Sequence, residues 1–173
     1  EVMKTWYGLM VQVPNIPDMS VPEGKEDSDN VEVRTWGTIP TFDFAPKDHI
    51  ELFEKHGMAD FERGTKIAGF RGYVLKGDGA RLVFALSQFV LNELMEEGFE
   101  PMIVPSLVRR APLTGTGFLP QGEEDLYKTQ DGDFLAGTAE VGTMGYHMDE
   151  VLSASELPKK YISFSPAFRR EAG

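Results

Sequence analysis

The stretch ARLVFALSQFVLNELMEE, residues 80–97, carries the clearest helical pattern in this sequence. Its apolar residues recur at spacings of three and four, which predicts a helix with one broad apolar face. Asp78 lies near the expected start, and Gly98 supplies a left-handed stop. We expect most of this face to pack in the core, and it is wide enough for a second subunit to cover part of it. The apolar positions are Leu82, Phe84–Leu86, Phe89, Val90, Leu94 and Met95.

Shorter elements surround this helix. Pro46 suits the first turn of a helix and Gly57 suits its end, so a helix is expected over 46–56. A strand is expected over 99–105, and Pro101 confines it to an edge, a bulge or an interface because proline donates no ladder hydrogen bond. The other expected elements are a helical turn over 59–63, strands over 31–34, 69–76 and 161–165, a hairpin over 126–136 and a helix over 137–147.

Residues 111–125 are rich in Gly, Thr and Pro. Their low apolar content predicts a loop outside the core. Residues 1–40 also look peripheral: a proline-rich extended segment over 14–22 is followed by an acidic loop over 23–30. The sequence does not begin with methionine, so its N-terminus looks cut.

Composition excludes several classes of protein. The chain has 173 residues, of which 41% are hydrophobic, enough for one globular domain. It has no cysteine, and its three histidines are scattered, so neither disulfides nor a zinc site is indicated. A net charge of −11 argues against general nucleic-acid binding. No apolar run is long enough to span a bilayer, and the whole pattern fits a cytoplasmic protein.

The segment Phe168-Arg169-Arg170-Glu171 suggests recognition of a nucleotide. A guanidinium grips a phosphate through two parallel hydrogen bonds, and a carboxylate two residues later on a strand faces the same side. A charged strand end that faces water would look identical. Thr138, upstream, is open to the same doubt, because the ordinary interpretation of a threonine at a helix start is a simple N-cap.

The order of these pieces resembles the catalytic domain of class II aminoacyl-tRNA synthetases, and specifically that of seryl-tRNA synthetases. The loop Gly-Thr-Gly-Phe-Leu-Pro at 115–120 is similar to one that we associate with seryl enzymes only. Thr138-Ala139-Glu140 resembles their serine-binding motif, where prolyl and threonyl relatives tend to carry Thr-Ser-Glu. The resemblance covers nearly the whole chain, through segments 14–17, 21–24, 29–37, 80–105, 115–128, 138–140 and 168–171.

This resemblance implies an α+β fold, part of a class II synthetase catalytic domain in which helices flank an antiparallel sheet. It also implies serine activation, in which the serine carboxylate attacks the α-phosphorus of ATP and pyrophosphate leaves. Mg²⁺ would bridge the ATP phosphates, although the sequence identifies no ligand for it. The other implied partners are tRNA(Ser), gripped by an N-terminal arm, and a second copy of the chain, bound through residues 80–105 as a homodimer.

The resemblance also assigns roles to single residues. Arg169 is the catalytic residue, which holds the α-phosphate and the serine carboxylate together. Glu171 accepts a hydrogen bond from the adenine amino group, while Arg170 is the spacer of the motif and is expected to face away. The resulting sets are Thr138, Ala139, Glu140 and Arg169 for serine, and Arg169, Arg170 and Glu171 for ATP, with no metal ligand.

Parts of the family's pattern are not found in the sequence. The coiled-coil arm is absent apart from, at most, a tail at residues 1–13, and so are the return strand of the second motif and the third motif. We therefore interpret residues 1–40 as the connecting arm after a missing coiled coil. Residues 41–173 would be the N-terminal part of the catalytic domain, truncated at the second motif. Such a fragment is expected to be inactive by itself.

Two other functions stay open at this stage. The first is a non-catalytic fragment that folds, dimerises through the 80–97 helix or binds ATP weakly. The second is a synthetase-like ligase that charges a carrier protein. Relatives of that second kind resemble the zinc-dependent branch, so the absence of cysteine and the Thr-Ala-Glu turn both count against it.

Overall fold

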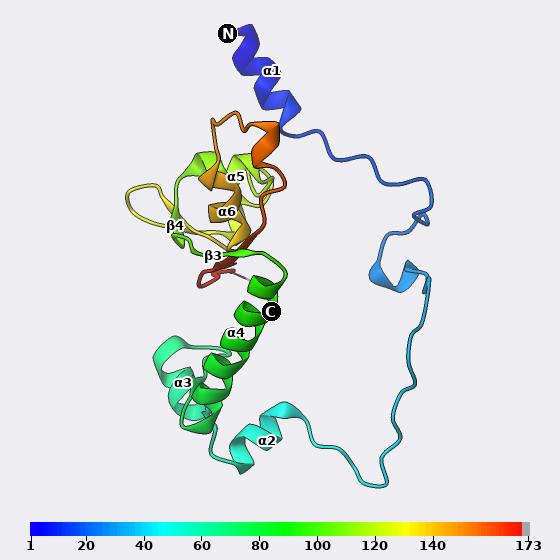
Figure 1. The fold of residues 1–173 in the computed structure, drawn as a ribbon. Helices are drawn as coiled ribbons and strands as arrows, with labels where there is room; N and C mark the ends of the chain where they lie inside the picture. Colours follow the sequence, from blue (N-terminus) through cyan, green and yellow to red (C-terminus); the bar gives the residue numbers. More distant parts are fainter. Residues whose placement is uncertain (171–173) are drawn as a thin grey trace. The chain divides into compact units, whose positions relative to one another are not determined.

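The computed structural model describes residues 1–170, and these form two units. The core unit comprises residues 1–14 and the chain from Phe89 onward, and the arm unit comprises residues 15–88. The ribbon, coloured along the sequence, labels the α-helices and two of the strands (Figure 1). Glu171, one of the predicted ATP-binding residues, lies outside the described residues. The domain boundary expected at residue 40 stays a prediction.

The arm unit begins with a long extended segment. Residues 15–48 contain one short 3-10 turn, η1 (Asp27–Asp29), and otherwise run as irregular chain. The strand expected over 31–34 is wrong, because none of the described strands pairs with it. Val33 there is 96% exposed. Alternation of apolar and polar residues stabilises a strand only where a partner satisfies the backbone and one face is buried.

Helix α2, His49–Lys55, confirms the helix expected over 46–56 but starts later. Asp48 is its N-cap, and the Asp48 carboxylate accepts a 2.8 Å hydrogen bond from the backbone N–H of Glu51. Pro46 therefore precedes the helix instead of lying in its first turn. The carboxylate satisfies a backbone donor that would otherwise have no partner in the helix, and this sets the start.

Helix α3 lies between two short strands that pair antiparallel. Gly64 lets residues 69–73 cross the helix closely, because a Cβ on Gly64 would stand 2.2 Å from the Cα of Tyr73. This crossing shortens the strand expected over 69–76, and α3 extends the turn expected over 59–63 into a helix. The elements are β1 (Ala59–Asp60), α3 (Phe61–Ala68) and β2 (Val74–Leu75).

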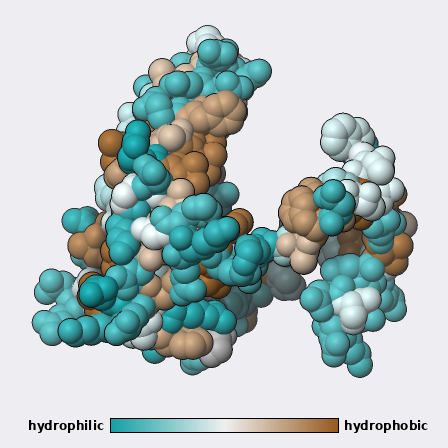
Figure 2. Space-filling view, turned by 90° about the horizontal axis from the view of Figure 1, so that it is seen from below, coloured by the Kyte–Doolittle hydropathy of each residue, from teal (hydrophilic) through white to brown (hydrophobic). Residues whose placement is uncertain are grey.

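Helix α4, Asp78–Glu96, confirms the helix expected over 80–97, and Gly98 follows it with a φ of +82°. The expectation that its apolar face lies mostly in the core is wrong for the described chain. Gly79 is the only buried residue of α4. Phe84, by contrast, is 74% exposed. Figure 2 shows that hydrophobic residues, in brown, reach the surface among the hydrophilic ones.

The core unit contains a parallel pair of strands, β3 (Glu100–Ile103) and β7 (Tyr161–Phe164). Both strands were expected, but an antiparallel sheet was expected throughout. The pair is parallel because the long connection over 104–160 brings the chain back in the same direction. Pro101 lies opposite Ile162 in this pair. β3 has no second partner strand among the described residues, as expected for a strand that contains a proline.

A second sheet in the core unit has the expected antiparallel form. Its strand order is β4-β6-β5. The hairpin expected over 126–136 supplies two of these strands, and Gly132 in its turn has a φ of +88°. The third strand extends the sheet on the other side of the hairpin. The strands are β4 (Leu107–Val108), β5 (Tyr127–Lys128) and β6 (Phe134–Leu135).

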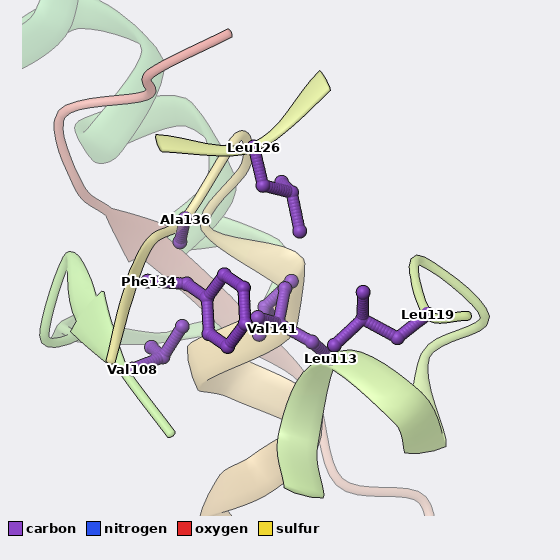
Figure 3. Packing of buried hydrophobic residues seen from close by; sticks show 7 residues of the cluster. All are labelled: Val108, Leu113, Leu119, Leu126, Phe134, Ala136 and Val141. Carbon is purple, nitrogen blue, oxygen red and sulfur yellow. The ribbon is translucent and has the colours of Figure 1, made fainter. Parts of the chain in front are cut away.

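The hydrophobic core packs around Phe134, which is 1% exposed. Val108 and Val141 lie beside its ring, and Leu113 and Leu119 lie further along (Figure 3). The interpretation of residues 111–125 as a loop outside the core is therefore wrong. Two of its few apolar residues, Leu113 and Leu119, are among the most buried side chains. Part of the segment is helical, as α5 (Arg110–Gly115) and the 3-10 turn η2 (Glu123–Asp125).

Three further elements complete the core unit. They are α1 (Val2–Met10), α6 (Glu140–Tyr146) and the 3-10 turn η3 (Ala154–Glu156). Helix α6 confirms the helix expected over 137–147 with a later start. Within residues 1–170, the helices are all too short or too polar to cross a membrane.

Candidate functional site

A recess of about 540 Å³ lies where the turn before α6 meets the segment after β7. Both segments were selected from the sequence as candidate binding elements, although residues 141–167 separate them along the chain. The structure brings Thr138, Ala139 and Arg169 to the same recess. The residues that line it are Gly137, Thr138, Ala139, Ala167 and Arg169.

The turn before α6 is positioned by the core sheet. Ala136, 1% exposed, donates a 2.7 Å hydrogen bond from its N–H to the carbonyl of Ser106. The N-cap of α6 is Ala139, which has no side-chain cap. Thr138 therefore lies one residue before the N-cap, and its hydroxyl accepts only a long 3.4 Å bond from the N–H of Glu140. The simple N-cap interpretation of Thr138 does not describe this geometry.

The segment after β7 is held against this turn by backbone and side-chain bonds. Phe168 donates its N–H to the carbonyl of Ala136 at 2.9 Å, and the Nε of Arg169 donates to the carbonyl of Gly137 at 3.0 Å. A Cβ on Gly137 would stand 3.2 Å from the Cγ of Arg169. The lack of a side chain at Gly137 thus lets the stem of Arg169 lie close to the turn.

Arg170 lies elsewhere. Its N–H donates to the carbonyl of Asp125 at 3.1 Å, and its Nη1 approaches the carbonyl of Glu124 at 3.4 Å. Arg170 is not among the residues that line the recess. It ties the segment after β7 to the acidic turn η2, and its assignment to ATP stays a prediction.

The remaining predicted serine-binding residue, Glu140, is exposed and does not line the recess. It is the first residue of α6, where a carboxylate also stabilises the positive end of the helix dipole. Gly137 and Ala167 line the recess although sequence reasoning did not select them. A glycine directly before the Thr-Ala-Glu turn was the available signal for the first, and nothing in the sequence pointed to the second.

A charged cluster of Arg110, Glu123 and Lys128 lies next to the core residue Phe134. Arg110 and Glu123 form two parallel hydrogen bonds of 3.0 and 2.7 Å, and the ammonium group of Lys128 lies 3.5 Å from the same carboxylate. The hydrogen bonds from Arg110 lower the pKa of Glu123 below its ordinary value, and the pKa of Arg110 is raised in return. Arg110 and Lys128 also lie over the ring of Phe134, at 5.9 and 5.5 Å.

The recess offers the chemistry of an anion and hydroxyl site. A guanidinium pairs well with phosphate or carboxylate, and a threonine hydroxyl with small polar groups. Among residues 1–170, no group of three histidine, aspartate or glutamate side chains could hold a metal ion.

No family model matches the chain. The serine–tRNA ligase of Deinococcus radiodurans is 49% identical to it over 166 residues, which cover 95% of this chain and 39% of that protein. The chain belongs to the seryl-tRNA synthetase family. It spans about two fifths of the length of the curated relatives it matches.

Two solved structures show the same relationship to the seryl-tRNA synthetase family. The seryl-tRNA synthetase of Pyrococcus horikoshii, complexed with ATP, has a TM-score of 0.89 and 34% identity over 98% of this chain and 42% of that protein. The cytoplasmic enzyme of Naegleria fowleri, in complex with AMP, has a TM-score of 0.85 and 29% identity over 97% of this chain and 40% of that protein. These relatives confirm the resemblance read from the sequence.

Proposed function

We propose that this chain takes part in the ATP-dependent activation of serine, as part of a serine–tRNA ligase. One observation carries the proposal: Arg169 lines the same recess as Thr138 and Ala139. In this proposal the guanidinium of Arg169 holds the α-phosphate and the serine carboxylate in line. Thr138 and the neighbouring turn hold the amino acid. Positioning of the two reactants and stabilisation of charge then supply most of the catalysis.

The nucleotide is ATP in this proposal. Two relatives support it, because one solved structure of the family contains ATP and another contains AMP. Arg170 and Glu171 complete the proposed ATP-binding set with Arg169. Mg²⁺ would accompany the ATP phosphates, but no residue of this chain is assigned to it. No step of the proposal depends on the metal.

Further partners belong to the same proposal. The activated serine would pass to tRNA(Ser), and the chain would work in the cytoplasm. A homodimer is proposed through residues 80–105, because the exposed apolar face of α4 lies in this range. Burial of that face against an identical helix would remove several large apolar side chains from water. The carrier-protein alternative gains no support from the relatives described above, which are named as serine–tRNA ligases.

Binding of a non-hydrolysable seryl-adenylate analogue tests the recess directly. Isothermal titration with the 173-residue chain should detect binding, and Arg169→Ala should weaken it about tenfold or more, because a charge-assisted hydrogen bond is worth about 1.5–3 kcal/mol. Arg169→Lys should restore only part of the loss, because lysine lacks the planar fork. The matched control is Arg109→Ala, which removes an exposed arginine of the core unit outside the recess.

Equal affinity of Arg169→Ala and Arg109→Ala for the analogue would refute the assigned role of Arg169.

A catalytic assay should accompany the titration. Among residues 1–170, five line the recess, and one of these five is charged. We therefore expect the 173-residue chain by itself to show no serine-dependent exchange of pyrophosphate into ATP above background. Exchange near the rate of a full-length relative would overturn that part of the proposal.

A further inference from the structure

A chain of hydroxyl groups links strand β7 to the turn that borders the recess. The Oγ of Ser163 lies 2.6 Å from the Oγ1 of Thr143, which in turn lies 2.9 Å from the carbonyl oxygen of Ala139. The hydroxyl of Thr143 has one proton, so it cannot donate to both partners. Both short contacts are satisfied only when Ser163 donates to Thr143 and Thr143 donates to Ala139.

This series of hydroxyl hydrogen bonds ends at a single peptide unit, the one between Ala139 and Glu140. Its carbonyl accepts a second hydrogen bond, from the N–H of Thr143 at 3.0 Å. Its N–H faces the hydroxyl of Thr138 at 3.4 Å. Two hydrogen bonds therefore hold this peptide at its carbonyl, and one long contact lies at its N–H. Two of the residues that line the recess, Thr138 and Ala139, flank or belong to it.

The link to β7 is more than an ordinary helix contact. A threonine that bonds to the carbonyl four residues earlier is common within helices, and by itself it holds nothing outside the helix. Here the bond continues to Ser163, on the strand that leads to Arg169. A second bond joins the same helix region to the same strand, between the Nε2 of His147 and the hydroxyl of Tyr161 at 2.8 Å.

We infer that Thr143 and Ser163 are positioning residues, whose hydroxyl chain sets the spacing between the Thr138–Ala139 side and the Arg169 side of the recess. This inference rests on the proposed function, in which one ligand spans both sides. A ligand that spans both sides depends on their spacing, because a misplaced contact loses much of its value. A ligand held at Arg169 alone does not depend on the spacing in this way.

The test compares two ligands on the same variants. Thr143→Val removes the hydroxyl and keeps the branched shape, whereas Thr143→Ser keeps the hydroxyl. Ser163→Ala removes the hydroxyl at the other end of the hydrogen-bonded series. By titration, Thr143→Val should weaken the seryl-adenylate analogue about fivefold, the scale of one net hydrogen bond, and ATP much less. Ser163→Ala should act in the same direction, and Thr143→Ser should stay close to wild type.

The matched control is Thr114→Val, because the hydroxyl of Thr114 makes the same kind of bond to the carbonyl of Arg110, at 3.1 Å, away from the recess. It should leave both affinities unchanged. Equal weakening of both ligands by Thr143→Val, or no difference between Thr143→Val and Thr143→Ser, would overturn the inference alone. A wild-type chain that binds neither ligand would overturn the proposed function, and the inference with it.

Discussion

Two apolar regions of this chain differ in how far their side chains are exposed to solvent. In the core unit, the cluster around Phe134 is closed to solvent, and Leu113 and Leu119 in it are 0% and 1% exposed. In α4, which is richer in large apolar residues, Phe84 and Leu86 are 74% and 61% exposed. The number of apolar residues in a segment thus does not decide whether the segment is buried.

The difference lies in what each region has to pack against. Leu113 lies in the short helix α5, and Leu119 lies in the turn that follows it. Both pack in one cluster with residues of the three-stranded sheet and with Val141 of α6 (Figure 3). Gly117, between these two leucines, has a φ of +80°, a backbone conformation that glycine adopts readily. Helix α4 presents a longer stripe, but most of it meets no surface supplied by the described residues. A stripe of that kind needs a partner.

The largest effect should follow from truncation at the centre of the cluster. Phe134→Ala is expected to destabilise the core unit by about 3–5 kcal/mol, through lost burial and the cavity left behind. Phe84→Ala, the same substitution on α4, should change the free energy of unfolding by less than about 0.5 kcal/mol in dilute solution. Urea unfolding followed by circular dichroism measures both. Equal losses would show that α4 is buried in solution as well.

The second effect concerns self-association through α4. If a second copy covers the stripe, Leu86→Glu places a charge in that interface and should weaken association by about 2 kcal/mol or more, roughly thirtyfold. Analytical ultracentrifugation across a concentration series measures the change. Val151→Glu is the matched control, because Val151 is fully exposed in the core unit and lies outside residues 80–105. A wild-type chain that remains monomeric at high concentration would refute the proposed homodimer.

Sequence patterns predicted those regular elements that local chemistry determines. The periodicity of α4, the Asp131-Gly132 turn of the hairpin and the glycine after α4 all act within a few residues. Burial, strand direction and pairing depend on distant segments. This is why the helix was placed well but its environment was not, and why β3 and β7 were found without their parallel pairing.

The candidate site shows the same division. Thr138, Ala139 and Arg169 were selected as motif residues, and the fold brings them together. Their neighbours Gly137 and Ala167 have no chemical signature of their own, so only the fold places them at the recess. The hydroxyl chain through Ser163 could not be predicted either, because it depends on how α6 lies against β7.

The smallest effect should come from the charged pair of Arg110 and Glu123 beside the buried cluster, where Arg110 lies over the ring of Phe134. Glu123→Gln removes the carboxylate that Arg110 holds, so the urea midpoint at neutral pH should fall slightly.

The pKa of Glu123 is lowered in the folded chain, chiefly by its hydrogen bonds from Arg110. The stabilisation is therefore present above the unfolded pKa, about 4.3, and is lost as the pH falls through the folded pKa. The difference between wild type and Glu123→Gln should accordingly shrink below about pH 4.3 and in high salt. The matched control is Glu124→Gln, one residue further along η2, which should leave the urea midpoint unchanged at every pH. If the difference between wild type and Glu123→Gln persists in acid, packing of the Glu123 side chain rather than its charge stabilises the core unit.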